Sequence, residues 1–587
     1  MQHKTGFQNT NFTTMYANDK MVLQLISLLK QFGIRKIVVS PGSRHNKLVH
    51  SLESDDFFQL YIVVDERSAA FFALGLIQSS GEAVAVTCSS GTACINYGSA
   101  VVEAFYQKLP LLVLSSDRIP ELLNQNEDQM YDQLSTFTKF TKYHCQLPVV
   151  EGETDEWYCN RLINEALIEL NHHGRGPVHI NIPFAAHHGA AFSVVDLPKV
   201  RKISLNKLPL TDEFWKEKAK EIAGKKVMIV WGQSVYPLEA TMQAADAFAE
   251  KTDAVIITDN MSNCHCKNAI INTTSVLDFF RPSEIELSRP DYVITLGGNY
   301  IFNNELKRWL KGGKYVHWHV GTEGVVCDPF WNLTQIFEMP EAYFFTQLAR
   351  YAEDNKTQYV NIWKELSQLP KLPDMHYCEF YAITSLMEKI PEDADLQLAN
   401  SQTIRMSQYI PLKETVRVNC NRGVNGIDGS LSTAVGFSAN NERPLYYITG
   451  ELSFFYDMNA LSIKHISKKM RILLINNRGG AVMYDQPKDT PEEKLPIYLA
   501  AGRDLTAKGW AESLGFKYLS ARNKEEVDVG VNELVADNDM PVILEVFTKL
   551  SEDRFSIGDY LKTLDRRTFM DKVEARLQMY VKKVIHR

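Results

Sequence analysis

Oxygen-bearing residues follow two apolar runs in the last third of the chain. Glu451 follows the run 445–449, and Asn477 follows the run 472–475, with Gly479 in the same turn. Two buried strands joined by a helix, whose apolar pattern starts at Met458, form a right-handed parallel unit, so both strand ends meet at one edge of the sheet. A carboxylate, an amide oxygen and a backbone carbonyl there suit Mg²⁺ or Ca²⁺, and Mg²⁺ prefers phosphate oxygens among its ligands. The pattern predicts a cation and diphosphate site, although a merely solvated turn explains one such motif in isolation better.

Strand ends in the first 200 residues carry charged residues as well. Ser43 and Arg44 follow the first apolar run, and Arg118 follows the fourth. Free N–H groups at a helix start together with a guanidinium group favour a carboxylate or phosphate partner. A solvated loop arginine explains the same pattern equally well. The runs that end in such polar turns are 36–39, 61–64, 83–87 and 111–114.

Glu66 follows the second of these runs and stands between apolar residues on both sides. A carboxyl group held in apolar surroundings has a raised pKa and can share a proton with a base. The alternative is an acidic residue that only interacts with the dipole of the helix it begins.

Alternating strands and helices along the whole chain predict an α/β protein with three doubly wound parallel-sheet domains. We expect domains at 1–202, 203–353 and 374–587, with a polar linker at 354–373. A chain of 587 residues is too long for a single core. No Gly-x-Gly-x-x-Gly pattern follows a strand in the middle domain, so we expect no dinucleotide there.

The composition narrows the class of protein. The net charge of −8 argues against a nucleic-acid surface. No apolar run is long enough to cross a membrane, and the first 20 residues contain no apolar signal core. Nine scattered cysteines predict reduced, buried thiols rather than a zinc site. We therefore expect a cytoplasmic protein without nucleic-acid partners or membrane insertion.

Gly450-Glu451-Leu452-Ser453 followed by Asn476-Asn477 resembles the diphosphate-binding motif of thiamine-diphosphate enzymes. The family motif begins with Gly-Asp, so Glu451 is a departure that moves the carboxylate outward by one methylene. The resemblance implies thiamine diphosphate and Mg²⁺ or Mn²⁺ as cofactors, with the metal held by Glu451, Asn477 and Gly479. It implies that Glu66 is the catalytic glutamate that holds the proton on the pyrimidine ring. It also implies that Val482 and Met483 line the thiazolium ring.

Further motifs resemble one family within this class, the 2-succinyl-5-enolpyruvyl-6-hydroxy-3-cyclohexene-1-carboxylate synthases. The resemblance extends from about residue 21 to the C-terminal region. It implies decarboxylation of 2-oxoglutarate and 1,4-addition of the succinyl carbanion to isochorismate, a transferase reaction of menaquinone biosynthesis. The motifs that carry it lie at 40–44, 65–67, 90–93, 117–121, 129 and 421–429.

The same resemblance implies which residues bind the substrates. Ser401 and Arg405 are expected to hold the succinyl carboxylate. The two ends of the cofactor are held by domains of different subunits in this class, which implies a homodimer or homotetramer. Another thiamine-diphosphate decarboxylase or carboligase, and a non-catalytic relative, remain open as alternatives. The residues expected around isochorismate are Ser43, Arg44, Arg118, Gln129, Lys307 and Arg422, with Arg308 completing a basic pair.

Overall fold

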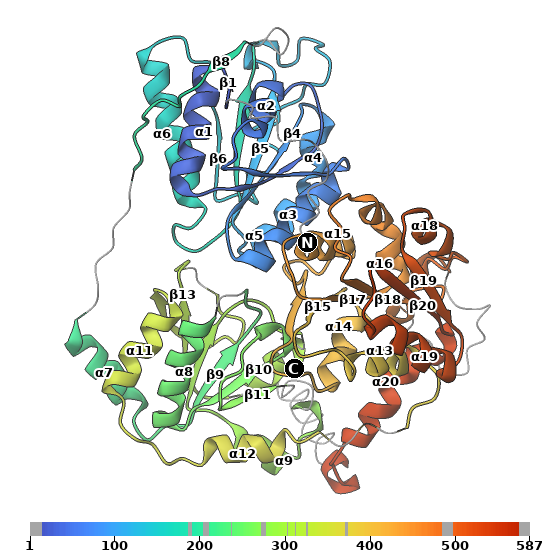
Figure 1. Cartoon of the computed structure of the whole chain (residues 1–587). Coiled ribbons are helices and arrows are strands. Elements are labelled where there is room, and N and C mark those ends of the chain that lie inside the picture. Colours follow the sequence, from blue (N-terminus) through green and yellow to red (C-terminus); the bar gives the residue numbers. More distant parts are fainter. Residues whose placement is uncertain are drawn as a thin grey trace. The chain divides into compact units, whose positions relative to one another are not determined.

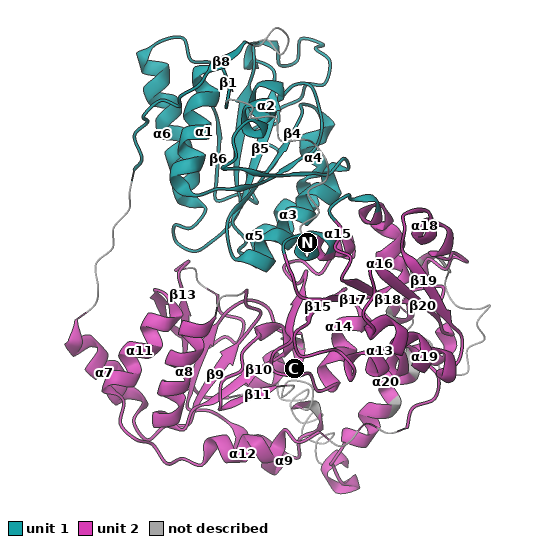
Figure 2. Cartoon of the chain, viewed as in Figure 1, with its two compact units in different colours: residues 1–207, 435–440, 462–465 teal, residues 208–434, 441–461, 466–587 magenta. Residues whose placement is uncertain are grey.

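The computed structural model of the chain contains three six-stranded parallel sheets with helices packed around them (Figure 1). This confirms the predicted α/β class. The chain separates into two compact units (Figure 2). Unit 1 comprises residues 1–207, 435–440 and 462–465, and unit 2 comprises residues 208–434, 441–461 and 466–587. The structure describes residues 14–185, 191–203, 211–235, 238–271, 277–301, 303–311, 313–324, 327–369, 372, 374–483 and 497–573.

Unit 1 contains a sheet with the strand order β3-β2-β4-β5-β7-β6. A short antiparallel pair, β1 (Tyr16–Ala17) and β8 (Phe192–Val194), lies outside this sheet. The six parallel strands are β2 (Lys36–Val39), β3 (Gln59–Ile62), β4 (Val84–Cys88), β5 (Leu111–Asp117), β6 (Tyr143–Gln146) and β7 (Val178–Pro183). The helices are α1 (Lys20–Phe32), α2 (Asn46–Glu53), α3 (Glu66–Ser80), α4 (Thr92–Asn96), α5 (Gly98–Gln107), η1 (Pro120–Leu122) and α6 (Glu153–Glu169).

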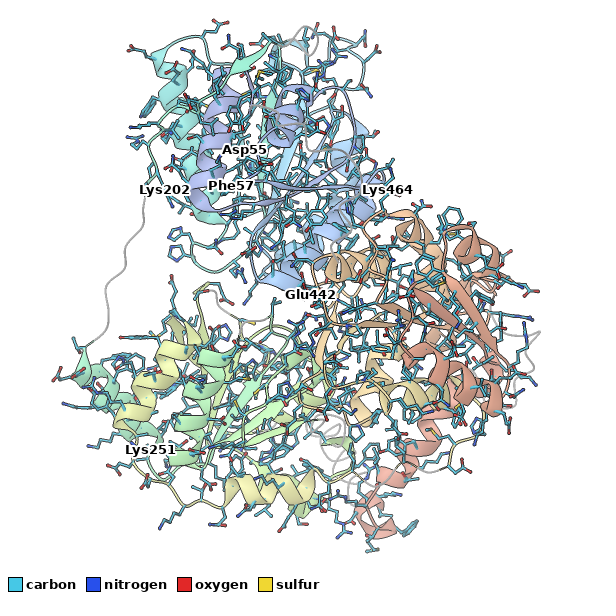
Figure 3. All side chains as sticks on the ribbon, in the orientation of Figure 1. Asp55, Phe57, Lys202, Lys251, Glu442 and Lys464 are labelled. Carbon is cyan, nitrogen blue, oxygen red and sulfur yellow. The ribbon has the colours of Figure 1, made fainter. Side chains whose placement is uncertain are left out.

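The first helix shows how local sequence sets these elements. Asp19 caps α1 by accepting hydrogen bonds from the backbone N–H groups of Met21 and Val22. Gly33 ends the helix in the left-handed conformation at φ 78°, which a glycine adopts without a steric penalty. Asp55, in the loop before β3, accepts hydrogen bonds from the backbone N–H of Phe57 and from Lys30 Nζ of α1 (Figure 3). This contact fixes α1 against the edge of the sheet.

A second sheet, in the middle of the chain, has the order β11-β10-β9-β12-β13-β14. Its strands are β9 (Val227–Trp231), β10 (Val255–Thr258), β11 (Ala269–Ile271), β12 (Tyr292–Leu296), β13 (Val316–Gly321) and β14 (Leu333–Glu338). Its helices are α7 (Asp212–Ile222), α8 (Glu239–Thr252), η2 (Asn260–Ser262), η4 (Leu277–Phe279), α9 (Pro282–Ser288), α10 (Asn303–Lys311), α11 (Glu341–Tyr351) and α12 (Tyr359–Leu366).

The strand order of this sheet reverses between β9 and β12, where open sheets bind dinucleotides. Here the two loops at that point contact each other, since a Cβ added at Gly232 would lie 2.0 Å from the Gly298 carbonyl oxygen. The side chain of Gln233 donates to the carbonyl oxygen of Cys420, at the end of a strand of the third sheet. The loops at this point of the sheet therefore contact each other and the third sheet.

The predicted linker at 354–373 is wrong in part, because α12 lies within it. Tyr359 and Trp363 are buried, and the Tyr359 hydroxyl donates to the carbonyl oxygen of Ser288 at 2.6 Å. Trp363 packs edge-to-face on Trp309 with ring centroids 5.4 Å apart. The segment was predicted to be a linker because its flanks are polar and contain proline. It contains a short amphipathic helix whose buried face belongs to the core of the middle region. The three predicted domain boundaries otherwise stay a prediction.

A third sheet, near the C-terminus, has the order β16-β15-β17-β18-β20-β19. Its strands are β15 (Asp395–Leu398), β16 (Arg417–Cys420), β17 (Leu445–Gly450), β18 (Met470–Asn476), β19 (Lys517–Ala521) and β20 (Val542–Phe547). Its helical segments are α13 (Glu379–Met387), α14 (Gln402–Met406), η5 (Ser407–Tyr409), α15 (Ser430–Ala439), α16 (Glu451–Tyr456), η6 (Met458–Ser462), η7 (Ala481–Met483), α17 (Ile497–Ala500), α18 (Lys508–Ser513), α19 (Lys524–Val535) and α20 (Leu550–Leu564).

The two strands predicted to carry the cation site, β17 and β18, are adjacent and parallel, as expected. The helix between them starts at Glu451, immediately after β17, whereas the apolar pattern predicted it from Met458. That later pattern forms a 3₁₀ segment instead. Glu451 is thus the first residue of a helix, close to its free N–H groups.

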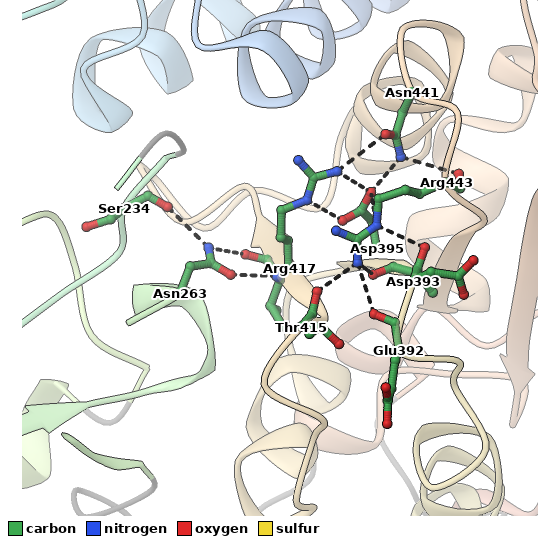
Figure 4. Close-up of polar contacts among 11 residues, drawn as sticks. Ser234, Asn263, Glu392, Asp393, Asp395, Thr415, Arg417, Asn441 and Arg443 are labelled. Atoms are coloured by element: carbon green, nitrogen blue, oxygen red, sulfur yellow. Dashed lines mark hydrogen bonds and ion pairs between the residues drawn. The ribbon is translucent and has the colours of Figure 1, made fainter. Parts of the chain in front are cut away.

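Buried polar contacts hold the amino ends of the third sheet's strands together (Figure 4). The fully buried Asp395 accepts two hydrogen bonds of 2.5 Å from the Arg417 guanidinium group, and a third from Asn441. On the neighbouring strand, the Asn263 side chain bonds both backbone groups of Val418, donating to its oxygen at 2.8 Å and accepting from its nitrogen at 2.7 Å.

Among the helices of the described residues, none combines the length and apolar character needed to cross a membrane.

Candidate functional site

A cavity of about 770 Å³ opens in unit 2 at the carboxyl ends of β15, β16, β17 and β18. The loop 299–305 after β12 lines another part of its wall. Ten of the residues predicted from the sequence line this one cavity: Ser401, Arg405, Arg422, Gly450, Glu451, Leu452, Ser453, Asn477, Gly479 and Met483. The fold therefore brings the predicted cation site and three of the predicted substrate residues to one place.

Glu451 is the most informative acid of this cavity. Its side chain is buried, with 5% exposure, and the N–H groups of Asn477 and Gly479 face its carboxylate. Burial raises the pKa of Glu451 to about 7, and the nearby negative charge of Asp553 contributes to the rise. Its Oε1 atom has no hydrogen-bond partner within the described residues. A buried carboxylate oxygen without a protein partner suits a bound cation.

Asn477 is held from both sides. Its Nδ2 donates to Asp553 Oδ2 at 3.0 Å, and its Oδ1 accepts from the Gly479 N–H at 3.2 Å. Asp553 was not predicted from the sequence. An acidic residue in the first turn of a helix ordinarily indicates a dipole contact, and its partner here lies 76 residues away in the chain.

Glu379 also lines the cavity and was not predicted. It is buried, with 5% exposure, and its Oε1 has no partner among the described atoms. Burial raises the pKa of Glu379 well above its usual range, and the charges of Asp553 and Glu451 add to this. No local pattern distinguishes this glutamate from any other at the start of a helix.

The residues present fit a cation bound to a diphosphate. Besides the two partnerless carboxylate oxygens, the Arg422 Nε atom is buried without a partner in the described structure. A Cβ added at Gly450 would meet nothing within 4 Å, so open space lies in front of the first turn of α16. The carboxylate of Glu451 and the Arg422 Nε donor thus line the same cavity. This combination of charges suits a divalent cation together with an anion.

The predicted succinyl-binding residues stand at the start of α14. Ser401 has φ 80°, a conformation that costs a residue with a Cβ of the order of 1–3 kcal/mol and is concentrated at functional sites. Burial lowers the pKa of Arg405, as does the positive charge of Arg422, while Glu305 opposes this. Two guanidinium groups are therefore close together in this wall of the cavity.

Arg422 itself is fixed by Asn400. Its Nη1 donates to Asn400 Oδ1 at 3.2 Å, and Asn400 in turn donates to the carbonyl oxygens of Asn421 and Gly426. Asn299 donates to the Arg422 carbonyl oxygen at 2.9 Å. The glycine-rich turn that follows β16 is thereby held in place from two regions of the chain.

The basic pair on α10 does not line this cavity. Asn304 and Glu305 supply the lining from that helix, while Lys307 is half-buried and Arg308 is exposed. Arg308 forms an ion pair with Glu305 at 3.6 Å. The role predicted for Lys307 and Arg308 stays a prediction.

The hydroxyl of Ser453 bonds to residues in and just after the loop that precedes α15. Its hydroxyl donates to the Ile427 carbonyl oxygen at 2.9 Å and contacts Ser430 Oγ at 2.7 Å. Met483 is 55% exposed at the rim. The side chain of Val482 lies outside the described part of the structure.

Unit 1 carries the predicted residues of the N-terminal sheet. Burial lowers the pKa of Arg44, and nearby Arg118 lowers it further while Asp117 and Glu127 oppose this. Arg118 donates to the Asp128 carbonyl oxygen at 2.8 Å and pairs with Glu127 at 3.3 Å.

Ser43 and Gln129 belong to the same edge of this sheet. Ser43 directly precedes Arg44 in the turn after β2. A Cβ added at Gly91, whose φ is 79°, would lie 3.1 Å from Gln129 Cβ. The turns after β2, β4 and β5 thus gather Ser43, Arg44, Arg118 and Gln129 at one edge.

Glu66 is the first residue of α3, and Asp65 caps that helix by accepting from the Ser68 N–H at 3.1 Å. The apolar enclosure predicted for Glu66 is not formed by the described residues of unit 1, since Glu66 is only half-buried. Val63 points into the core and Val64 is 75% exposed, because successive residues of an extended chain point to opposite sides. Unit 1 alone therefore does not enclose Glu66, and the apolar pocket around it stays a prediction.

Comparison with known proteins extends these observations. A family model described as "Thiamine pyrophosphate enzyme, N-terminal TPP binding domain" matches residues 20–136. A solved structure from Mycobacterium smegmatis, described as that of a proposed thiamin diphosphate-dependent enzyme, superposes with a TM-score of 0.66. It covers 91% of this chain and 100% of its own at 15% sequence identity, which shows a shared fold.

Two curated relatives are similar over nearly their whole length. The 2-succinyl-5-enolpyruvyl-6-hydroxy-3-cyclohexene-1-carboxylate synthase of Phocaeicola vulgatus is 37% identical over 565 residues, covering 94% of this chain and 100% of the relative. The synthase of the same name from Cytophaga hutchinsonii is 30% identical over 561 residues, covering 93% of this chain and 99% of the relative. With the three-sheet fold, these matches show that the chain is a thiamine-diphosphate-dependent enzyme and belongs to the 2-succinyl-5-enolpyruvyl-6-hydroxy-3-cyclohexene-1-carboxylate synthase family.

Proposed function

We propose that the protein decarboxylates 2-oxoglutarate and transfers the remaining succinyl group to isochorismate by 1,4-addition, as a step of menaquinone biosynthesis. The observation that carries the proposal is the cavity of unit 2, where Glu451 and Asn477 lie with Arg405 and Arg422. An acidic site for a cation and a basic wall for carboxylates are both needed by this reaction.

Thiamine diphosphate, when bound, supplies the nucleophilic carbon that attacks the 2-oxo group. Glu451, Asn477 and the Gly479 carbonyl oxygen would hold Mg²⁺ or Mn²⁺ and, through it, the diphosphate. Glu66 would share a proton with the far ring nitrogen of the aminopyrimidine. A carboxyl group can hold a proton at that atom and return it, which an amide cannot.

The chain's own cations would bind the carboxylates of the substrates. After decarboxylation three carboxylates remain, one on the succinyl group and two on isochorismate. Ser401 and Arg405 would hold the first, and Arg422 would hold one of the others. Arginine forms paired hydrogen bonds with a carboxylate, whereas lysine acts as a point charge. The other proposed isochorismate residues are Ser43, Arg44, Arg118, Gln129, Lys307 and Arg308.

We further propose that the protein acts in the cytoplasm as a homodimer or homotetramer. The proposal follows from the class of enzyme to which the chain belongs, in which subunits share active sites. No nucleic-acid partner is expected from the net charge of −8.

The direct test is incubation of the full-length protein with 2-oxoglutarate, isochorismate, Mg²⁺ and thiamine diphosphate. Release of CO₂ and loss of isochorismate absorbance should occur together, with equal amounts of each. Release of CO₂ without any loss of isochorismate would support a different decarboxylase or carboligase. Absence of both would contradict the proposed reaction.

A further inference from the structure

Asp553 lies in the first turn of α20 and is completely buried. Its Oδ1 accepts a hydrogen bond from the Glu379 N–H at 2.7 Å, and its Oδ2 accepts from Asn477 Nδ2 at 3.0 Å and from the Thr548 hydroxyl. One carboxylate therefore joins the start of α13, the end of β18 and the turn after β20.

These contacts determine the orientation of the Asn477 amide. An ionised carboxylate can only accept hydrogen bonds, so Asn477 must turn its Nδ2 toward Asp553. Its Oδ1 then lies on the opposite side, where it accepts from the Gly479 N–H and where Asn477 lines the cavity. If the Asn477 amide were rotated by half a turn, its Oδ1 would face Asp553 Oδ2 and the two oxygens would repel each other. The Oδ1 atom would also lose the hydrogen bond from the Gly479 N–H.

The surroundings supply a second observation that points to a cation. Glu379, next to Asp553, lines the cavity with Glu451. One carboxylate oxygen of each glutamate is buried without a partner in the described structure. Asp553 and the two incompletely bonded glutamates place three buried acids in one small region, and a cation in the cavity would compensate their negative charge.

We propose that Asp553 is a positioning residue of the cation site, which holds the Asn477 amide oxygen toward the cation while touching neither the cation nor the diphosphate. The inference rests on the proposed function, because the cation site is part of it. Residues that orient a metal ligand typically change metal affinity by roughly 10–100-fold when they are replaced.

The residue before Asn477 offers a matched control. Asn476 donates to Glu545 Oε1 at 2.7 Å, and Glu545 is also completely buried. Neither residue is among those that line the cavity. β18 thus ends at one asparagine and is followed by a second, each fixed by a buried acid, and only Asn477 lines the cavity.

The experiment measures Mn²⁺ affinity by electron paramagnetic resonance in the presence of thiamine diphosphate, with the full-length protein. Asp553→Asn should weaken Mn²⁺ binding by about 10–100-fold. In this variant the side-chain oxygen at position 553 can keep the hydrogen bond from the Glu379 N–H. The NH₂ group at position 553 then faces Asn477, and the Asn477 oxygen turns toward it and away from the cavity. Glu545→Gln, an equally conservative change of a buried acid, should leave Mn²⁺ affinity unchanged.

A rescue variant separates positioning from general stability. Asn477→Asp in the Asp553→Asn background restores the amide–carboxylate pair with exchanged roles and should recover most of the lost affinity. If Asp553→Asn does not fold, as judged by circular dichroism, Thr548→Val carries the test and should weaken Mn²⁺ binding by a smaller factor.

Wild-type Mn²⁺ affinity in folded Asp553→Asn, or no recovery in the double variant, would overturn the role of Asp553 alone. Absence of Mn²⁺ binding by the wild-type protein would overturn the proposed cation site itself. The two failures are therefore distinguishable, and neither depends on turnover of substrate.

Discussion

Arg118 already contacts a carboxylate of its own chain. Glu127 lies 3.3 Å from Arg118 Nη1, with 36% side-chain exposure, in the segment after η1. A substrate carboxylate that binds Arg118 would compete with this partner. Partly exposed ion pairs of this kind contribute up to about 1 kcal/mol, which corresponds to about fivefold in affinity.

Glu127→Gln should therefore lower the apparent KM for isochorismate by up to about fivefold, since the competing charge is removed. Steady-state kinetics at fixed 2-oxoglutarate measures the change. Glu121→Gln, on the exposed segment η1, is the matched control and should have no effect. Arg118→Ala should raise the same KM sharply, and unchanged kinetics in that variant would contradict the placement of Arg118.

Glu66→Gln should reduce turnover by about 10²–10⁴-fold, because the amide keeps the shape of the side chain but cannot exchange the proton. Thiamine diphosphate should still bind, which isothermal calorimetry measures. Retained activity in Glu66→Gln would refute the mechanism proposed for this enzyme.

The predicted residues that lie together in the structure are those that one short motif contains. Glu451 and Asn477 each end a recognisable apolar run, and the structure brings both to one cavity. Glu379 and Asp553 could not be predicted, because their contact joins segments 174 residues apart. A single acidic residue at a helix start carries no sequence signal that distinguishes a buried contact from a solvated one.

At the level of elements, alternation of apolar runs and turns was enough to predict the three parallel sheets. It was not enough for α12, whose four buried residues lie between polar and proline-containing flanks. Nor was it enough for α16, where the strand β17 passes directly into a helix without the usual polar turn. Periodicity is weakest in segments of six to eight residues, because few positions repeat.

The loop that follows β12 is held to the end of β10 by Asp259. This buried acid accepts from the Ile301 N–H at 2.9 Å and from the Met261 N–H at 3.0 Å, and Ile301 lines the cavity. Burial raises the pKa of Asp259 to about 6, although these hydrogen bonds and the charge of Arg422 oppose the rise. The folded protein therefore binds this proton more tightly than the unfolded chain.

The contribution of Asp259 to stability is consequently largest below pH 4, declines as the pH rises from 4 to 6, and is lost above pH 6. The rise in the pKa of Asp259 from 3.8 to about 6 corresponds to about 3 kcal/mol of unfolding free energy. Asp259→Asn should remove this part of the pH dependence. Urea unfolding of both proteins between pH 4 and 7 measures it, and parallel pH profiles would contradict the prediction.

At the scale of the whole molecule, the proposed sharing of active sites between subunits can be tested by mixing two inactive variants. If each site takes Glu66 from one subunit and Glu451 from another, a mixture of Glu66→Gln and Glu451→Gln proteins regains activity. The expected level is about one quarter of the wild-type activity, since half of randomly exchanged dimers are mixed and one of their two sites is intact.

The mixed sample is assayed after the subunits have been allowed to exchange, and light scattering gives the oligomeric state of each variant. Unmixed variants are the controls. An inactive mixture, in samples shown to have exchanged subunits, would indicate that each subunit builds its site alone.

One polar contact between the middle and last sheets has a consequence for the solubility of the chain. β16 is the outermost strand of its sheet, and Asn263 pairs with both backbone groups of Val418 as a further strand would. An open strand edge is a template on which other chains can add and aggregate. A fragment that begins at residue 374 would expose this edge, so the middle region protects the catalytic sheet from self-association as well as lining its cavity.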